Sequence, residues 1–564
     1  MFAYIGNKRA LLPFLREQFS RALEDTHFPS APRFYDPFAG TGAASRLARM
    51  MGMDVHANDW EFYSSQYNRA YLVNSREDAE MHFSHRGGLQ VFLDEINRLG
   101  RGAMKDGLPP GVPAYISAYY APPKTEEADY RHHRLFYTAE NARFIDTVRH
   151  FIDCEVEAPA ARNLLLALLL YQAGTHANTS GVFKAYHKGF GGLGRDALGR
   201  IMRPMSLPYP VLPTGNELPE NQHCEVTSRD AAMANGRSYD LVYLDPPYNG
   251  HQYGSNYFML NTIARWDKPP VDQRRGTDGR FVKKAAIRED WVDTRSEFCY
   301  ADRAPSAFTT LLENLDSPRI LLSYNTEGII PFEQLTEIMS RQGRLQILTR
   351  EYTTYRGGRQ SAGRKVRNME FILYLDRRNR SRSADMKEIR RITAVRRLER
   401  LAEASFDPRR VPVMNHHTAS SGAGPAARIK LGDIGNLHMP FFFEFSRDAR
   451  QDFKRGISSL DTRTIEELVD QLESVSLDSH IERAEALIEI IRREHEAGLP
   501  CEEHVSSLLW SMNKFSFRKY RGEFFRIVSG VREDIADKRL PDFSKRIDAL
   551  ERRVAPRLSM AHGA

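Results

Sequence analysis

Short apolar runs alternate with longer stretches of helical periodicity over roughly the first 376 residues. Five of the runs have the length of strands, and four of them lead into an Asp, Asn or Ser: Arg33–Tyr35, Asp54–Ala57, Cys224–Thr227, Leu241–Leu244 and Arg319–Ser323. Strands that alternate with helices are typical of a parallel sheet covered by helices. The pattern therefore predicts an α/β fold.

Two further runs differ in that a basic loop separates them. They are Leu345–Tyr352 and Met369–Leu375, and the loop between them carries the basic stretch Arg356–Arg367. Two apolar runs joined in this way predict an antiparallel hairpin. We expect this hairpin to close one edge of the sheet.

The pattern changes after the last of these runs. Residues 377–400 hold ten Lys or Arg in 24 positions, which predicts a solvated charged helix or linker, or alternatively an arm that contacts phosphates. Residues 418–427 are rich in Gly, Ser, Pro and Ala and predict a loop. Helical periodicity follows, with a capping box expected at Thr464 and Glu467 and a second helix over Ile481–His495.

These changes suggest four regions in a chain that is long enough for two or three domains. The sheet domain comprises residues 1–74 and 221–376, and residues 75–220 form an inserted helical region. A basic linker over 377–430 leads to a mainly helical domain over 431–564. We expect the last region to contact DNA or a protein partner, because the arginine-rich stretch leads into it.

Composition narrows the class of protein only slightly. The 41% hydrophobic content is sufficient for real cores, and the net charge of +7 is a mild excess that is compatible with a polyanionic partner. The four cysteines form no CxxC pair, which argues against a thiolate zinc site and a disulfide framework. The longest apolar run, Leu164–Leu170, is far shorter than the roughly 20 residues of a membrane span. The start lacks a signal-peptide pattern, so we expect a soluble cytoplasmic protein that needs no metal.

The first candidate site follows the first strand. Asp36 precedes a tight turn with Gly40 and Gly42, and the turn opens a helix whose first N–H groups are unpaired. No Lys-Ser or Lys-Thr follows, so the turn is not a phosphate-binding P-loop, and a carboxylate suits a cationic group such as an ammonium. The second strand leads into Asp59, which is placed to bind ribose hydroxyls. Together the two elements predict an adenosine-containing ligand.

The strongest signal follows the strand Leu241–Leu244. This strand delivers Asp245, Pro246, Pro247 and Tyr248 to the carboxyl end of the sheet, where α/β proteins bind their ligands. The prolines make the turn rigid, so the Asp245 side chain and the Pro246 carbonyl can present two acceptors to one planar NH2 group. Tyr248 can stack on the base that carries this group.

The four-residue turn Asp245–Tyr248 resembles motif IV of amino-directed DNA methyltransferases, and Asp36–Gly42 resembles their motif I. The opening Tyr4–Leu12 is similar to motif X of the Dam-like, alpha-class adenine methylases, and the order of the motifs is also alpha-class. Residues 243–267 and 322–328 resemble methylases of type IIS restriction–modification systems. The resemblance implies a Rossmann-like class I methyltransferase sheet, with target recognition in the insertion.

The resemblance also implies S-adenosylmethionine as cofactor. The residues that it assigns to the cofactor are Tyr4, Lys8, Asp36, Phe38, Gly40, Gly42, Asp59 and Asp230. Asp36 would hold the methionine ammonium, Asp59 the ribose, and Tyr4 and Lys8 would close over the ligand. Asp230 matches motif III and would accept from the cofactor adenine, but a simple cap at the strand end is an equally good interpretation.

A mixed segment, Thr175–Gly189, resembles the part of Dam-like enzymes that touches DNA beside the extruded base. The expected DNA-contacting residues are His176, Asn178, Lys184, Lys188 and Tyr257. The match is loose, because Lys184 stands where the family often has Asn, and an ordinary surface loop is the alternative.

The resemblance implies methylation of the exocyclic N6 amine of a flipped adenine in double-stranded DNA, with a cognate restriction endonuclease as a further partner. No cysteine stands at a Pro-Cys site, which argues against methylation of a cytosine ring carbon. Cytosine N4, RNA or protein substrates, a bifunctional restriction–modification protein and an idle DNA-binding module stay open as alternatives.

Overall fold

A computed structural model of the chain contains two compact units, Met1–Asp385 and Met386–Ala564. The residues that it describes are 8–24, 27–192, 195–234, 236–325, 328–349, 370–402, 404–407, 427–430, 436–439, 456–457, 459–477, 479–496, 498, 500–516, 520–532 and 541–559. Within these ranges, no helix combines the length and the apolar character that crossing a bilayer requires.

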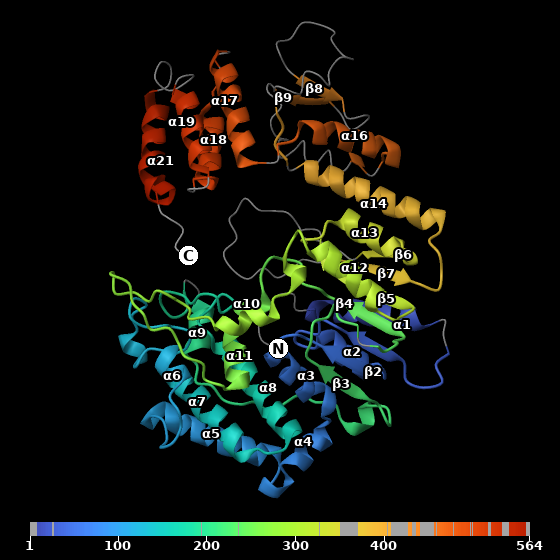
Figure 1. The fold of residues 1–564 in the computed structure, drawn as a ribbon, viewed down its shortest axis with the longest axis vertical. Coiled ribbons are helices and arrows are strands. Elements are labelled where there is room, and N and C mark those ends of the chain that lie inside the picture. Colours follow the sequence, from blue (N-terminus) through green and yellow to red (C-terminus); the bar gives the residue numbers. More distant parts are fainter. Residues whose placement is uncertain are drawn as a thin grey trace. The chain divides into compact units, whose positions relative to one another are not determined.

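The first unit is a mixed α/β structure around a seven-stranded sheet with the order β3-β2-β1-β4-β5-β7-β6 (Figure 1). Its strands are β1 (Arg33–Asp36), β2 (Asp54–Asn58), β3 (Cys224–Thr227), β4 (Leu241–Leu244), β5 (Arg319–Asn325), β6 (Arg344–Thr349) and β7 (Glu370–Asp376). Strands β1 to β5 are parallel, whereas β7 runs antiparallel to both β5 and β6. All five expected parallel strands are present, and the basic loop expected over 356–367 lies outside the described residues.

Helices connect these strands and form the insertion. Their bounds are α1 (Leu12–Leu23), α2 (Ala43–Met50), α3 (Phe62–Val73), α4 (Arg76–His82), α5 (Leu89–Asp106), α6 (Ile116–Tyr119), α7 (Ala139–Glu155), α8 (Pro159–His176), α9 (Arg195–Met202), α10 (Tyr253–Asn256), α11 (Phe258–Arg265), α12 (Ala304–Asn314) and α13 (Phe332–Ser340). Apolar side chains of α1 and α2, such as Phe19 and Ala48, pack on Phe34 and Leu241 of the sheet. This packing fixes the carboxyl ends of β1 and β4 as neighbours.

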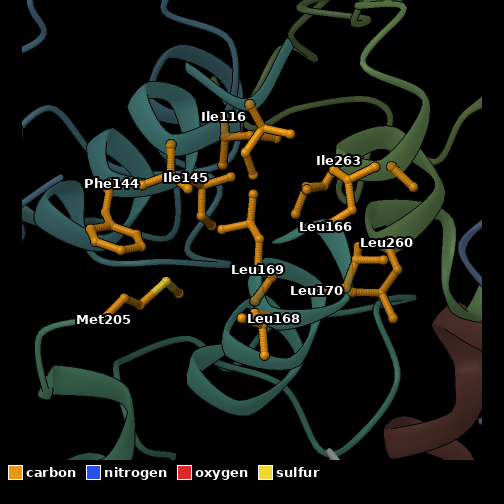
Figure 2. Packing of buried hydrophobic residues seen from close by; sticks show 14 of the residues in the cluster. Ile116, Phe144, Ile145, Leu166, Leu168, Leu169, Leu170, Met205, Leu260 and Ile263 are labelled. Carbon is orange, nitrogen blue, oxygen red and sulfur yellow. The ribbon is translucent and has the colours of Figure 1, made fainter. Parts of the chain in front are cut away.

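The insertion has a large apolar core of its own, part of which Figure 2 shows. Leu166, Leu169 and Leu170 of α8 point into it beside Ile145 of α7 and Ile263 of α11, and all five side chains are buried. The apolar run that is too short for a membrane span is therefore the central helix of this core. Residues of α11, which belongs to the segment that follows β4, take part in this core, whereas the apolar cluster on the sheet is a separate one.

The second unit contains α14 (Ser383–Leu401), which begins just before the boundary between the units, and then β8 (Ala427–Lys430), β9 (Asn436–Met439), α16 (Thr462–Val475), α17 (His480–Glu496), α18 (Glu502–Lys514), α19 (Arg521–Val531) and α21 (Pro541–Ser559). One apolar cluster joins α14 to α16, and a second joins the helices from α17 onward. The expected helix over Ile481–His495 is α17, which extends one residue further at each end.

Two expectations for this part of the chain change. The capping box expected at Thr464 is wrong, because α16 begins two residues earlier and Asp461 is its cap, accepting the Thr464 N–H at 2.9 Å. The arginine-rich stretch includes a helix, α14, and its Arg390 and Arg397 form ion pairs with glutamates of α16. These pairs favour the charged-helix interpretation of the stretch over a free arm.

The contact between α5 and α7 gives a stability prediction. A methyl group at Gly100 would lie 2.3 Å from the buried Phe144 ring, whereas one at Gly102 would meet nothing within 4 Å. Overpacking costs about 1–3 kcal/mol, and replacing a helical glycine by alanine stabilises by roughly 0.5–1 kcal/mol. We expect Gly100→Ala to lower the melting temperature and Gly102→Ala to raise it. Calorimetry of the two variants tests this, and shifts in the same direction would contradict it.

Candidate functional site

The carboxyl ends of β1, β2, β3 and β4 surround a cavity whose empty space, including the part open to solvent, is about 930 Å³. Its walls include the turn after β1, the end of β2, the loop after β3 and the turn after β4. The segment that contains Thr294, Ser296 and Phe298 covers a further side. A cavity at this edge of an α/β sheet is where such folds bind ligands.

Asp36 closes β1 and is almost fully buried at the cavity wall. Its Oδ2 accepts a hydrogen bond from the Ser45 hydroxyl at 2.7 Å, while its Oδ1 has no hydrogen-bond partner among the described residues. Burial, supported by repulsion from Asp245, raises the pKa of Asp36 to about 7, although the Ser45 bond opposes this shift. A buried carboxylate with one unpartnered oxygen suits a positively charged group of a ligand.

The turn after Asp36 brings backbone to the cavity. Gly40 and Gly42 have φ values of +51° and +72°, which is the left-handed region that glycine enters without strain. A side chain at Gly42 would also place its Cβ 2.1 Å from the Asn68 amide oxygen. Phe38 lies on the cavity wall and meets the Phe298 ring edge-on at 5.1 Å.

Asp59 follows β2 and lies against this turn. Its Oδ2 accepts the Gly40 N–H at 2.8 Å, and its Oδ1 accepts the Glu61 N–H at 2.9 Å. Burial raises the pKa of Asp59. Each carboxylate oxygen can accept more than one hydrogen bond, so Asp59 retains acceptor capacity toward hydroxyl groups of a ligand in the cavity.

Asn58 connects the loops that form the cavity. Its buried side-chain amide donates to the Pro37 carbonyl at 3.1 Å and to the Arg229 carbonyl at 3.0 Å. Its carbonyl oxygen accepts the Thr227 hydroxyl at 2.9 Å. One side chain thereby joins the ends of β1, β2 and β3.

The turn after β4 carries the second part of the site. The ammonium of Lys8 lies 3.0 Å from the Asp245 carboxylate and 5.6 Å from the centre of the Tyr248 ring. Lys8 is 5% exposed, so this ion pair is largely shielded from water. Pro246 is buried, Pro247 lines the cavity, and Tyr248 is half-buried with its carbonyl accepting the Ile329 N–H. Tyr4 lies outside the described residues.

Asp230 lies in the loop after β3 and lines the same cavity. Its Oδ1 accepts the Ala232 N–H at 3.0 Å, so it also caps the turn after the strand. Both interpretations of this residue are therefore compatible with its position.

Three of the five side chains that were expected to contact DNA are buried. Asn178 is fully buried, and its side-chain amide donates to the Leu135 carbonyl while its oxygen accepts the Gly191 N–H. His176 is buried against its own helix, and Tyr257 is buried beside Tyr63. The protein encloses each of these three side chains, and their contact with DNA stays a prediction. Lys184 and Lys188 are exposed.

Several residues at the cavity carry no recognisable motif. Glu61 accepts hydrogen bonds from Asn261 and Thr294, and burial raises its pKa to about 7. Gln252 exchanges two hydrogen bonds with the backbone of Ser296, at 3.0 and 2.8 Å. These contacts join segments that are far apart in the sequence. The one sequence signal for them is the position of Glu61, two residues after Asp59.

Comparison with known proteins agrees with this geometry. A family described as D12 class N6 adenine-specific DNA methyltransferase matches residues 4–284. The type II methyltransferase M.NlaIII of Neisseria lactamica is 31% identical over 361 residues, which are 63% of this chain and 92% of that protein. The chain therefore belongs to the D12 class. It is an adenine-specific DNA methyltransferase.

Two further relatives show how far the similarity extends. M.CviAII, a type II methyltransferase of Paramecium bursaria Chlorella virus 1, is 27% identical over 375 residues, or 66% of this chain and 98% of that protein. M.FokI of Planomicrobium okeanokoites is 29% identical over 383 residues, which again are 66% of this chain but only 52% of that longer protein. Each of these two matches thus leaves about a third of this chain uncovered.

The buried carboxyl of Asp36 gives a pH-dependent prediction. A pKa raised from 3.8 to about 7 contributes stability at low pH that is lost as the pH rises through 7. Asp36→Asn resembles the protonated form at every pH. We expect its free energy of unfolding to rise relative to that of the wild type by about 3 kcal/mol from pH 5 to pH 8. Melting temperatures without ligand test this, and the same difference at both pH values would contradict it.

Proposed function

We propose that this chain is the modification methylase of a restriction–modification system, and that it transfers a methyl group from S-adenosylmethionine to the N6 amine of a flipped adenine in double-stranded DNA. The observation that carries the proposal is a single cavity that joins the unpartnered carboxylate oxygen of Asp36 to the Asp245–Tyr248 turn. The relatives of this chain include type II methyltransferases and modification methylases, which supports the link to restriction.

The residues of the cavity fit this cofactor. Its ammonium and sulfonium are cationic, and the cavity wall carries Asp36 and Asp245, whose repulsion a cation would relieve. Asp36 would bind the ammonium through Oδ1, the backbone at Gly40 would approach closely, and Asp59 would accept from the ribose hydroxyls. Asp230 would accept from the adenine amine. Bound there, S-adenosylmethionine supplies an electrophilic methyl group.

The turn after β4 would hold the target base. Extruding an adenine from the duplex costs a few kcal/mol, and stacking on an aromatic ring such as Tyr248 returns about 1–3 kcal/mol. The Asp245 carboxylate and the Pro246 carbonyl would accept hydrogen bonds from the two N–H groups of the amine. These bonds would favour a more tetrahedral nitrogen with an available lone pair. As the nitrogen bonds to the methyl carbon, the bond from that carbon to the sulfonium sulfur would break, and the amine would lose one proton, which the Asp245 carboxylate would accept.

Lys8 would act on this step through Asp245. Its ammonium lies 3.0 Å from the carboxylate, in a site where both side chains are mostly buried. The ion pair fixes the direction of the carboxylate before the base arrives, so that the acceptor needs no rearrangement during the reaction. Lys184 and Lys188, which are exposed on the loop that Asn178 organises, would contact the DNA backbone.

The reaction is tested by transfer of labelled methyl from S-adenosylmethionine to unmethylated genomic DNA, with modified-base sequencing of the product. We expect N6-methyladenine at one recurring short sequence. Asp245→Ala should reduce the rate at least about 100-fold, as expected for loss of a preorganised polar contact. Asp94→Ala, an exposed carboxylate on α5, is the matched control and should retain the wild-type rate. Full activity of Asp245→Ala would refute the role of this turn.

The role of Asp36 is tested by calorimetric binding of S-adenosylmethionine at pH 6. Because its pKa is about 7, Asp36 is mostly protonated at pH 6 and must release a proton to bind an ammonium. The apparent binding enthalpy should therefore depend on the ionisation enthalpy of the buffer. Asp36→Asn should bind more weakly and release nearly one proton fewer. Equal proton release by both proteins would exclude Asp36 as the ammonium ligand.

A further inference from the structure

Arg134 is a buried cation with an unusual set of partners. It is 1% exposed, and its guanidinium donates to four backbone carbonyls, of Tyr119, Asp272, Lys283 and Lys284. Its Cζ also lies 3.8 Å from the centre of the Phe281 ring. Three of the four carbonyls flank one segment, so Arg134 holds together the two ends of residues 272–284.

Between these ends the chain forms a short exposed hairpin, Arg274–Val282. Arg275 and Phe281 form an antiparallel bridge, the Val282 N–H donates to the Arg274 carbonyl at 3.0 Å, and Gly279 with φ of +74° lies in the turn. Residues 272–284 hold five Lys or Arg against two Asp. Asp278 lies 3.6 Å from Arg280, but both side chains are more than half exposed, and such a pair retains little of its attraction in water.

The hairpin meets two other basic segments at Tyr130. The ring centre of Tyr130 lies 6.0 Å from Arg280 of the hairpin, 5.8 Å from Arg131 and 5.3 Å from Lys188. A hydrogen bond from Arg131 and the charge of Lys188 lower the pKa of the Tyr130 hydroxyl, as expected where the potential is positive. A backbone carbonyl near this ring, that of His132, accepts from Arg275 at 3.0 Å and ties the segments together.

This cluster is connected to the reactive turn through one short path. Lys188 belongs to the loop that Asn178 organises, and Phe183 of that loop donates its N–H to the Asn256 carbonyl at 2.7 Å. Asn256 ends α10, which begins five residues after the Asp245–Tyr248 turn. The loop that carries Lys188 thus rests on the segment next to the turn where the base would bind.

We propose that Arg280, Arg131 and Lys188, gathered around Tyr130, form one phosphate-binding surface for the target duplex, and that the hairpin Arg274–Val282 is held in place for this contact by Arg134. The inference rests on the proposed function, because it assigns the DNA side of the same enzyme. Exposed guanidinium and ammonium groups suit phosphate oxygens, and phosphate contacts fix the register in which a protein meets the bases.

The test measures binding of the full chain to a fluorescent 30-base-pair duplex of mixed sequence at several salt concentrations. Each phosphate contact contributes about 0.9 to the slope of the logarithm of affinity against the logarithm of salt concentration, whatever the sequence. We expect Arg280→Gln and Lys188→Gln each to reduce this slope by about 0.9, and the double variant by about twice as much. Arg98→Gln removes an exposed charge on α5 and should leave the slope unchanged.

Binding of S-adenosylmethionine by the same variants separates this inference from the function on which it rests. Unchanged cofactor affinity together with smaller slopes supports the surface. Wild-type slopes in both variants overturn the surface but leave the proposed function intact. A wild-type protein that binds the cofactor but no duplex overturns both.

Discussion

The side-chain amide of Asn58 holds the site together. It bonds to the loops after β1 and β3 while its own strand, β2, lies between those strands. This arrangement needs a parallel sheet in which three carboxyl ends lie at one edge. It also needs burial, because an amide exposed to water would exchange these partners for solvent. With the loops fixed, Gly40 can bond to Asp59, and Asp36 faces the same cavity without rearrangement.

The sequence predicted the features that are local. The five parallel strands, the glycine turn and the Asp-Pro-Pro-Tyr turn each follow from a few adjacent residues, whose spacing and backbone preferences act at short range. Contacts between distant segments carry no such signal. The contacts of Gln252 with Ser296 and of Arg134 with four carbonyls depend on how distant segments pack. The expected contact of Asn178 with DNA comes from the resemblance of its segment to Dam-like enzymes. The burial of Asn178, which the sequence of that loop does not reveal, also gives it a structural role in the loop.

Burial shifts pKa values in opposite directions in two parts of the first unit. At the sheet edge, Asp36, Asp59 and Glu61 are buried acids whose pKa values are raised by burial. In the insertion, Arg134 is a buried cation whose pKa burial lowers, and its guanidinium donates to four backbone carbonyls. Under the proposed function the acids would meet a cationic ligand, whereas the arginine already donates to the backbone that it organises.

The ion pair between Lys8 and Asp245 has a consequence for the order in which the protein is made. Lys8 precedes Asp245 by 237 residues, so its partner leaves the ribosome much later. At the usual 5–20 residues per second, the delay is roughly 10–50 s. During that interval the ammonium has no buried carboxylate to meet. A nascent chain that ends before β4 therefore lacks this ion pair, and under the proposed function it also lacks the turn that would hold the target base.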